Sequence, residues 1–146
     1  MSKAGNYKTY GDLPSLEAVK RPKDNFMRVE LLQNMDHLKA LVQQHQVLIS
    51  MVSGEWCVPC QKLAPNYEQL AENMKDISQI KCVYENIDDE NCCHKSIVTN
   101  VPTFLVYIDG KLSKTFVGEF DKLTELVNKI LERYASTSKS QIFKTY

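Results

Sequence analysis

The chain has 146 residues, of which 43% are hydrophobic and 25% are charged, values typical of one globular domain. Its 18 basic and 18 acidic side chains balance, which argues against nucleic acid or an anionic membrane surface as the main partner. No run approaches the roughly 20 apolar residues that span a bilayer, and the first residues lack the apolar stretch of a secretory signal. We therefore expect no membrane insertion and a reducing, cytoplasmic location.

The two ends of the chain differ in composition from its middle. Residues 1–25 carry glycine and proline among polar side chains, and residues 135–146 are similarly polar. We expect an N-terminal extension over residues 1–25 that is flexible or binds a partner, one folded domain over residues 26–134, and a C-terminal tail over residues 135–146.

The first elements of this domain alternate between strand and helix. MRVELL predicts a short strand, and Asn34 can cap a helix whose apolar residues recur at helical spacing. Val47–Val52 is a nearly unbroken apolar run, typical of a strand that is covered on both faces in a parallel sheet. A longer helical pattern begins at or beside Cys57, and Pro65 inside it predicts a kink.

The second half adds strands and a last helix. IKCVYENI predicts a strand, and ENCCHKSI a short helical or irregular crossover. Two β-rich runs meet at Asp109-Gly110, a strong hairpin signal, and Asp121 can cap the final helix. The order strand, helix, strand, helix, strand, helix, strand, strand, helix predicts an α/β fold, with a central mixed β-sheet flanked by helices on both faces.

Two cysteines, Cys57 and Cys60, stand between the buried strand and the long helix in SGEWCVPCQKLAP. At a helix start, unpaired N–H groups and the positive end of the helix dipole favour thiolate over thiol. Residues one turn apart have Cβ atoms about 5–6 Å from each other, close to disulfide distance. Pro59 stiffens this loop, and Trp56 is expected to shield one side of it. The context favours a dithiol that is oxidised and reduced in a working cycle.

Other chemistries remain open for the cysteines. The five cysteines are an odd number, which argues against a paired disulfide framework. Zinc or an iron–sulfur cluster would use thiolates together with His94, but the adjacent Cys92 and Cys93 fit a tetrahedral site poorly, and we expect no metal. Cys92 and Cys93 could instead be regulatory thiols, or one of them could be packed in the core while the other is merely exposed. Cys82 is expected to be a small core residue.

With these residues in view, the chain resembles the thioredoxin family over about residues 26–134. WCVPC is similar to the family's WCGPC, with Val58 where glycine is usual. Four further positions fall on the family pattern, namely Pro65 in LAP, Asp88 in NID, Pro102 in VPTF and Gly118 in FVG.

The resemblance implies a thioredoxin fold and a thiol–disulfide oxidoreductase that reduces protein disulfides through the catalytic residues Cys57 and Cys60. It implies no bound cofactor beyond the redox-active Cys57–Cys60 disulfide. The partners it implies are protein disulfide substrates and an upstream disulfide reductase. Support for the active site is expected from Trp56, Val58, Pro59 and Pro102. The substrate-binding edge, built around a cis-proline bond, is expected at Trp56, Val101, Pro102, Thr103 and Gly118.

Three positions depart from the family pattern. Met51 stands where a buried aspartate is usual, Tyr84 where its lysine partner is usual, and Ser53 where a tryptophan is usual. Loss of acid and base together is self-consistent, because either alone would be a costly buried charge. We therefore expect the resolving step to be slower, or to use water or Glu55. The runner-up function is a thioredoxin-like binding module in a larger assembly, with little or no redox turnover.

Overall fold

A computed structural model describes the backbone of residues 29–145 and the side chains of residues 29–134. The N-terminal extension expected over residues 1–25 lies outside the described residues. The described elements are β1 (Val29–Leu31), α1 (Met35–Gln44), β2 (Val47–Ser53), α2 (Val58–Asn73), β3 (Ile80–Asn86), β4 (Thr103–Ile108), β5 (Lys111–Val117) and α3 (Phe120–Thr145). No helix within residues 29–145 combines the length and apolar composition that crossing a bilayer requires.

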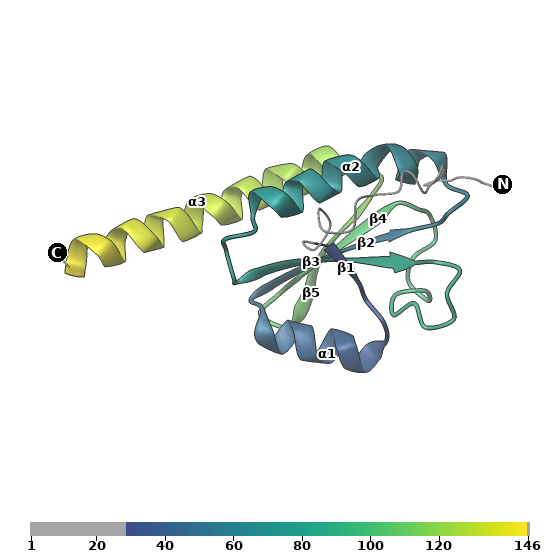
Figure 1. The fold of residues 1–146 in the computed structure, drawn as a ribbon, viewed down its shortest axis with the longest axis horizontal. Helices are drawn as coiled ribbons and strands as arrows, with labels where there is room; N and C mark the ends of the chain where they lie inside the picture. The colour runs from purple at the N-terminus through teal and green to yellow at the C-terminus, as the bar shows by residue number, and fades with distance from the viewer. Residues whose placement is uncertain (1–28, 146) are drawn as a thin grey trace.

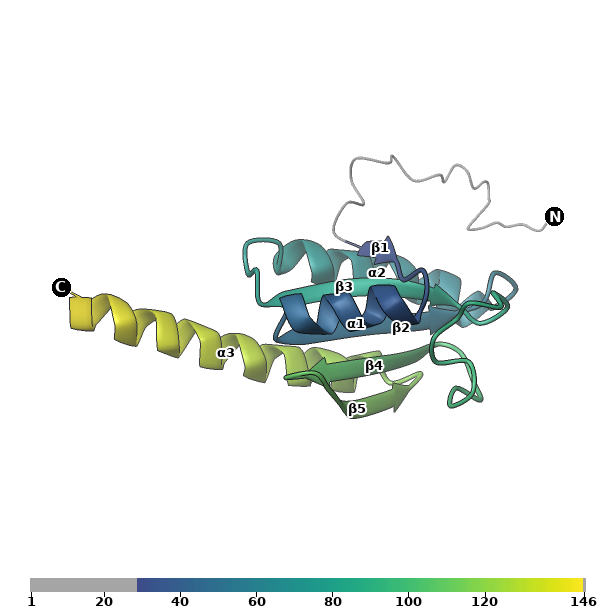
Figure 2. The same cartoon turned by 90° about the horizontal axis from the view of Figure 1, so that it is seen from below.

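The strands form one mixed sheet in the order β1-β3-β2-β4-β5. Strand β2 pairs in parallel with β3 and antiparallel with β4, and the β4–β5 hairpin forms one edge of the sheet. Helix α1 covers one face, and α2 and α3 cover the other, as Figures 1 and 2 show from two directions. All 7 residues of β2 are buried, as its unbroken apolar run predicts. The expected α/β fold is confirmed.

The sheet separates two packed layers, which we name the α1 face and the α2–α3 face. On the α2–α3 face, Met51 packs in one cluster with Tyr67 of α2 and Leu123 of α3. On the α1 face, Leu48 packs with Leu38 of α1. Successive strand residues point to opposite sides, so neighbours along β2 or β3 contribute to different layers. This alternation decides which side chains lie under the cysteines.

Two local predictions are confirmed. The Asn34 side chain accepts a hydrogen bond from the His37 N–H at 2.9 Å and so caps α1. Asp109 and Gly110 both have positive φ values, of 53° and 81°, at the β4–β5 turn. Such a turn matches the right-handed twist of a hairpin, and glycine adopts this conformation without steric cost.

The crossover from β3 to β4 differs from the predicted element order. Residues 87–102 form turns and bends without a helix, so the irregular form expected for ENCCHKSI is observed and the extra helix is wrong. Local side chains satisfy backbone groups that a helix would use. The Asp89 carboxylate, for example, accepts the Asn91 N–H at 2.9 Å.

The start of α3 also corrects a prediction. Helix α3 begins at Phe120, and the Glu119 carbonyl accepts hydrogen bonds from the N–H groups of residues 122 and 123. Asp121 therefore lies inside the first turn and is not the cap. The helix continues to Thr145 and projects beyond the sheet in both views (Figures 1 and 2). Helix α2 runs through Pro65, where a kink stays a prediction.

Candidate active site

The candidate site begins where β2 ends. A short turn follows, in which the Cys57 N–H donates to the Gly54 carbonyl at 3.0 Å. Cys57 is the N-cap residue of α2, and its Sγ accepts a hydrogen bond from the Cys60 N–H at 3.2 Å. A reduced sulfur here would face the positive end of the helix, which stabilises its thiolate. The helix start expected beside Cys57 is confirmed.

Cys57 and Cys60 are joined by a disulfide, with Cα atoms 5.2 Å apart. Cys57 is 4% exposed, whereas Cys60 is 0% exposed, so an incoming group meets Cys57 first. Pro59 is the second residue of α2, where a missing N–H leaves no acceptor unsatisfied. The pair found from sequence is therefore present in its oxidised state.

An exposed apolar rim flanks the pair. Trp56 is 65% exposed and Val58 is 55% exposed. The indole N–H of Trp56 donates to Asp88 Oδ2 at 2.7 Å, which fixes the ring orientation. Gly54 allows this arrangement, because a Cβ there would lie 2.8 Å from the indole ring. The sequence analysis gave no role to Asp88 and did not identify Gly54 as a site residue. The only sequence signal for Gly54 was its position two residues before Trp56.

Gly54→Ala is expected to push the Trp56 indole away from Asp88 while leaving the fold intact. The added methyl group would meet the ring, and the exposed ring is free to move aside. Trp56 is the only tryptophan of the chain, so its emission spectrum reports the change directly. Glu55→Ala in the same turn is the matched control. An unchanged emission spectrum in Gly54→Ala would show that the indole ring does not pack against residue 54.

The cis-proline segment lies against the cysteines. The Val101–Pro102 peptide bond is cis, and the Val101 carbonyl oxygen lies 3.6 Å from Cys57 Sγ. The Gly118 N–H donates to the Pro102 carbonyl at 2.8 Å, and Gly118 has a φ of 65°. Thr103 is buried, and its hydroxyl donates to the Asn100 carbonyl at 2.5 Å. The structure thus places Val101 beside Cys57 and joins Gly118 to Pro102, the next residue along.

Apolar packing takes the place of a charged pair beneath the cysteines. Met51 is 0% exposed and belongs to the same cluster as Cys57 and Cys60. Tyr84 is the partner of Met51 on β3, and its hydroxyl donates to Glu68 Oε2 at 2.6 Å. Residue 51 therefore offers a thioether and no proton acceptor to the layer that contains Cys60.

The remaining three cysteines are free thiols. Burial raises the pKa of Cys82 to about 12. Burial and the negative charge of Glu85 raise the pKa of Cys92 and that of Cys93 to about 11. Such thiols hold little thiolate at neutral pH, which weighs against a regulatory role. Residues 29–134 contain no group of three or more histidine, cysteine or acidic side chains that could hold a metal ion.

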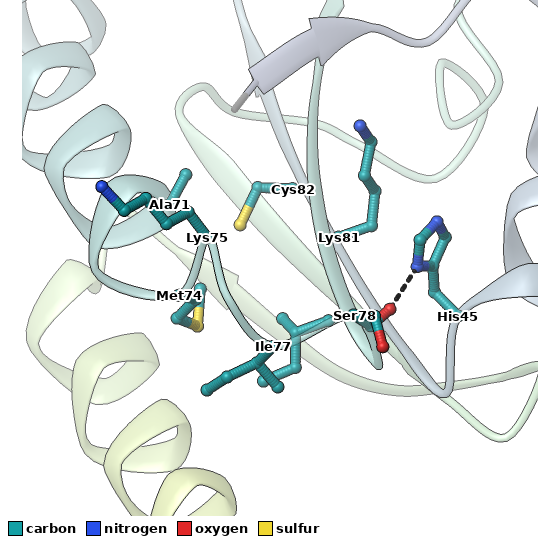
Figure 3. Close-up of a pocket in the computed structure, with 9 residues that line it drawn as sticks. His45, Ala71, Met74, Lys75, Ile77, Ser78, Lys81 and Cys82 are labelled. Carbon is teal, nitrogen blue, oxygen red and sulfur yellow. Dashed lines mark hydrogen bonds between the residues drawn. The ribbon is translucent and has the colours of Figure 1, made fainter. Parts of the chain in front are cut away.

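A cavity of about 240 Å³ lies beside the amino ends of β2 and β3 (Figure 3). Its wall includes Cys82, and at its rim the His45 Nδ1–H donates to the Ser78 carbonyl at 2.8 Å. Cys57 follows the opposite, carboxyl end of β2. The cavity is therefore separate from the cysteine pair.

The geometry of strand, N-cap cysteine and cis-proline can be compared with known proteins. A sequence model described as Thioredoxin matches residues 28–132. The chain belongs to the thioredoxin family. Thioredoxin 1 of Plasmodium falciparum is 26% identical over 108 residues, which cover 74% of this chain and 99% of that protein. Thioredoxin of Bacillus subtilis is 40% identical over 88 residues, 58% of this chain and 83% of that protein.

Solved thioredoxin structures share the fold. The X-ray structure of Fasciola hepatica thioredoxin is 28% identical, with a TM-score of 0.60, and the match covers 70% of this chain and 98% of that one. This thioredoxin-family chain is accordingly a protein-disulfide oxidoreductase, as the sequence motifs indicated. Thioredoxins work with their active-site disulfide and need no further cofactor.

Proposed function

We propose that the chain reduces protein disulfides, with Cys57 as the attacking sulfur and Cys60 as the resolving sulfur. One observation carries this assignment: Cys57 Sγ lies at the N-terminus of α2 and also 3.6 Å from the Val101 carbonyl oxygen. The helix end stabilises the thiolate, and the neighbouring edge can hold a substrate against it. The complete burial of Cys60 supports its use only after a substrate is bound.

The first step joins the protein to its substrate. In the reduced protein, the Cys57 thiolate attacks one sulfur of a substrate disulfide, and a Cys57–substrate disulfide forms. The other substrate sulfur leaves as a thiolate and takes a proton from water.

The second step releases the substrate. Cys60 loses its proton, and its thiolate attacks Cys57 Sγ, so the Cys57–Cys60 disulfide forms and the second substrate sulfur leaves and is protonated. Two electrons have then passed from the dithiol to the substrate. An upstream disulfide reductase must return two electrons before the next turnover.

Substrate docking is assigned to the cis-proline edge. An extended substrate segment would pair with the backbone at Val101 and lie between Trp56 and Gly118, as an added strand. The exposed side chains of Trp56 and Val58 supply apolar contact area beside the sulfurs. Pro102 and Thr103 shape this edge through the cis bond and the internal hydroxyl hydrogen bond.

The resolving step is proposed to be slower than in family members that have a buried acid. Met51 is not able to accept the proton that Cys60 releases, because a thioether has no basic site at neutral pH. The proton then passes to water or to Glu55, which is exposed in the turn before the motif.

A reducing compartment such as the cytoplasm fits the cysteine content. Three of the five cysteines are free thiols, including the adjacent Cys92 and Cys93. The relatives include thioredoxins of bacteria and of chloroplasts. We further propose the division into an extension over residues 1–25, a catalytic domain over residues 26–134 and a tail from residue 135 onward.

Two measurements test the proposed function. The wild type is expected to catalyse insulin reduction by dithiothreitol, and Cys60→Ser is expected to stop at a stable mixed disulfide through Cys57. Cys60→Ser removes the resolving sulfur and leaves the attacking one in place, so mass spectrometry of the trapped adduct names the bound cysteine. A folded, reduced wild type without turnover, from which only noncovalent partners are recovered, would favour the binding-module alternative.

A further inference from the structure

A group of buried polar side chains lies on the α1 face and has no part in the disulfide chemistry. Glu85 of β3 is 1% exposed, and His94 of the crossover is 3% exposed. Ser50 of β2 and Tyr107 of β4 complete the group, together with Cys92 of the crossover. We name these five residues the Glu85 cluster. Since Tyr84 packs on the α2–α3 face, its neighbour Glu85 lies on the side of the sheet opposite Cys60.

Four donors converge on the Glu85 carboxylate. Ser50 Oγ–H donates to Oε2 at 2.7 Å, and His94 Nδ1–H donates to the same oxygen. The backbone N–H of His94 donates to Oε1 at 3.2 Å, and Cys92 Sγ lies 3.5 Å from Oε1 as a fourth donor. Three of the four donors therefore belong to the crossover. The far ring nitrogen of His94, Nε2, lies 2.7 Å from the Tyr107 hydroxyl of β4.

This arrangement offsets the cost of a buried charge. Burial disfavours the ionised form of Glu85, but the hydrogen bonds from His94 and Ser50 outweigh it and lower the pKa of the carboxyl below its usual value. A buried carboxylate with a full set of donors holds them firmly, because each buried donor left unpaired would carry the cost of its lost hydration. The crossover has no helix or strand of its own, so these bonds fasten it to the sheet.

A short chain of contacts leads from His94 to the docking edge. The His94 carbonyl accepts hydrogen bonds from the N–H groups of Ile97 and Val98, each at 3.1 Å. Val98 is buried in a small cluster with Val52, and Val101 packs against the same cluster. The Val101 carbonyl is the one that lies 3.6 Å from Cys57 Sγ.

We propose that Glu85 is a positioning residue for substrate binding: by holding Cys92 and His94 against the sheet, it fixes the crossover and thereby the cis-proline edge at Val101. This inference rests on the proposed function, since it assigns Glu85 to the docking of a protein disulfide. Glu85 acts through the crossover and touches neither sulfur of the pair. It therefore sets the affinity for extended protein substrates and leaves the chemistry of the sulfurs unchanged.

Two substitutions separate the charge of Glu85 from its hydrogen bonding. Glu85→Leu keeps a similar volume but removes every acceptor. Glu85→Gln can keep the connections, with its carbonyl toward the His94 backbone N–H and its amide toward His94 Nδ1 in the other ring tautomer. The conservative variant is thus expected to rescue the function that the leucine variant loses.

The expected result is a change in KM without a change in reactivity. Glu85→Leu should raise the KM for insulin about tenfold, as when only a tenth of the molecules hold a competent edge. Its kcat and its rate with the small hydroxyethyl disulfide should stay within about twofold of the wild type. Glu85→Gln should stay close to the wild type in all of these. Amide exchange at Val98 should be faster in Glu85→Leu than in the wild type.

Ile80→Ala is the matched control. Ile80 is buried at the amino end of the same strand, beside the distant cavity, so the variant loses stability without touching the crossover. Its KM for insulin should not change, nor should the rate of amide exchange at Val98 relative to the rates in the sheet. If Glu85→Leu does not fold, Tyr107→Phe replaces it, because it removes one hydroxyl from the far end of the cluster. About a threefold rise in KM is expected there.

Defined outcomes overturn the proposal. It fails if folded Glu85→Leu keeps a wild-type KM and wild-type exchange at Val98, or if Ile80→Ala changes both as much. It also fails if Glu85→Leu slows the reduction of hydroxyethyl disulfide as strongly as it slows the reduction of insulin. A wild type that does not reduce insulin would refute the proposed function instead. Amide exchange would still show whether Glu85 fixes the crossover.

Discussion

Cys57→Ser is expected to lower the rate of insulin reduction by about 10³-fold or more, the scale of loss when a covalent nucleophile is removed. Serine keeps the shape of the side chain and can still cap α2, so the fold should be unchanged. Its hydroxyl is not ionised at neutral pH, so no mixed disulfide can form. Turnover with dithiothreitol as reductant, followed by turbidity, measures the effect.

Cys82→Ala is the control for this experiment. Cys82 is a buried thiol with a pKa of about 12, and it lines the cavity at the opposite end of β2 and β3. Its removal should leave the rate within about twofold of the wild type. Substantial turnover in Cys57→Ser would assign the attack to Cys60 and would contradict the order of events derived from burial and the helix start.

Phe104→Ala is expected to lower the free energy of unfolding by about 3–5 kcal/mol, the usual cost of deleting a fully buried phenylalanine. Phe104 is 0% exposed, and its ring contacts those of Tyr67 and Phe120, with centroids 5.8 Å and 5.6 Å away. It thereby joins β4 to α2 and to the start of α3. A loss of this size is a large share of the total stability of a typical domain.

Urea denaturation measures this loss, and Phe116→Ala provides the comparison. Phe116 is the partner of Phe104 on the edge strand β5 and is only half-buried. Phe116→Ala should therefore lower the free energy of unfolding by clearly less than Phe104→Ala does. Equal losses in the two variants would mean that burial at the sheet centre does not dominate the stability of this fold.

Much of the fold follows from local sequence patterns. The run Val47–Val52 has the composition of a doubly covered strand, and Asp109-Gly110 has the residue types that a tight hairpin turn needs. The sequence left a helical and an irregular crossover both open, because nothing local in ENCCHKSI shows that residues 92 and 94 bond to a carboxylate on β3. Tertiary hydrogen bonds decided its conformation.

The candidate site was predictable to a similar extent. The short spacing of Cys57 and Cys60 before a helical pattern fixed their place at a helix start. The role of Gly54 was not predictable, since it depends on how the indole of Trp56 folds back over the chain. The contact between Tyr84 and Glu68 likewise joins two elements, and no spacing along one element reveals it.

The placement of Met51 and Glu85 in different layers of the sheet has a consequence for engineering. The two residues are close along the paired strands, since Met51 pairs with Tyr84 and Val52 pairs with Glu85, but their side chains point to opposite sides of the sheet. Changes around Met51 therefore act on the layer that contains the cysteines, and changes around Glu85 act on the crossover that carries the docking edge. An engineer could then address the release of substrate and its capture from opposite faces of the same sheet.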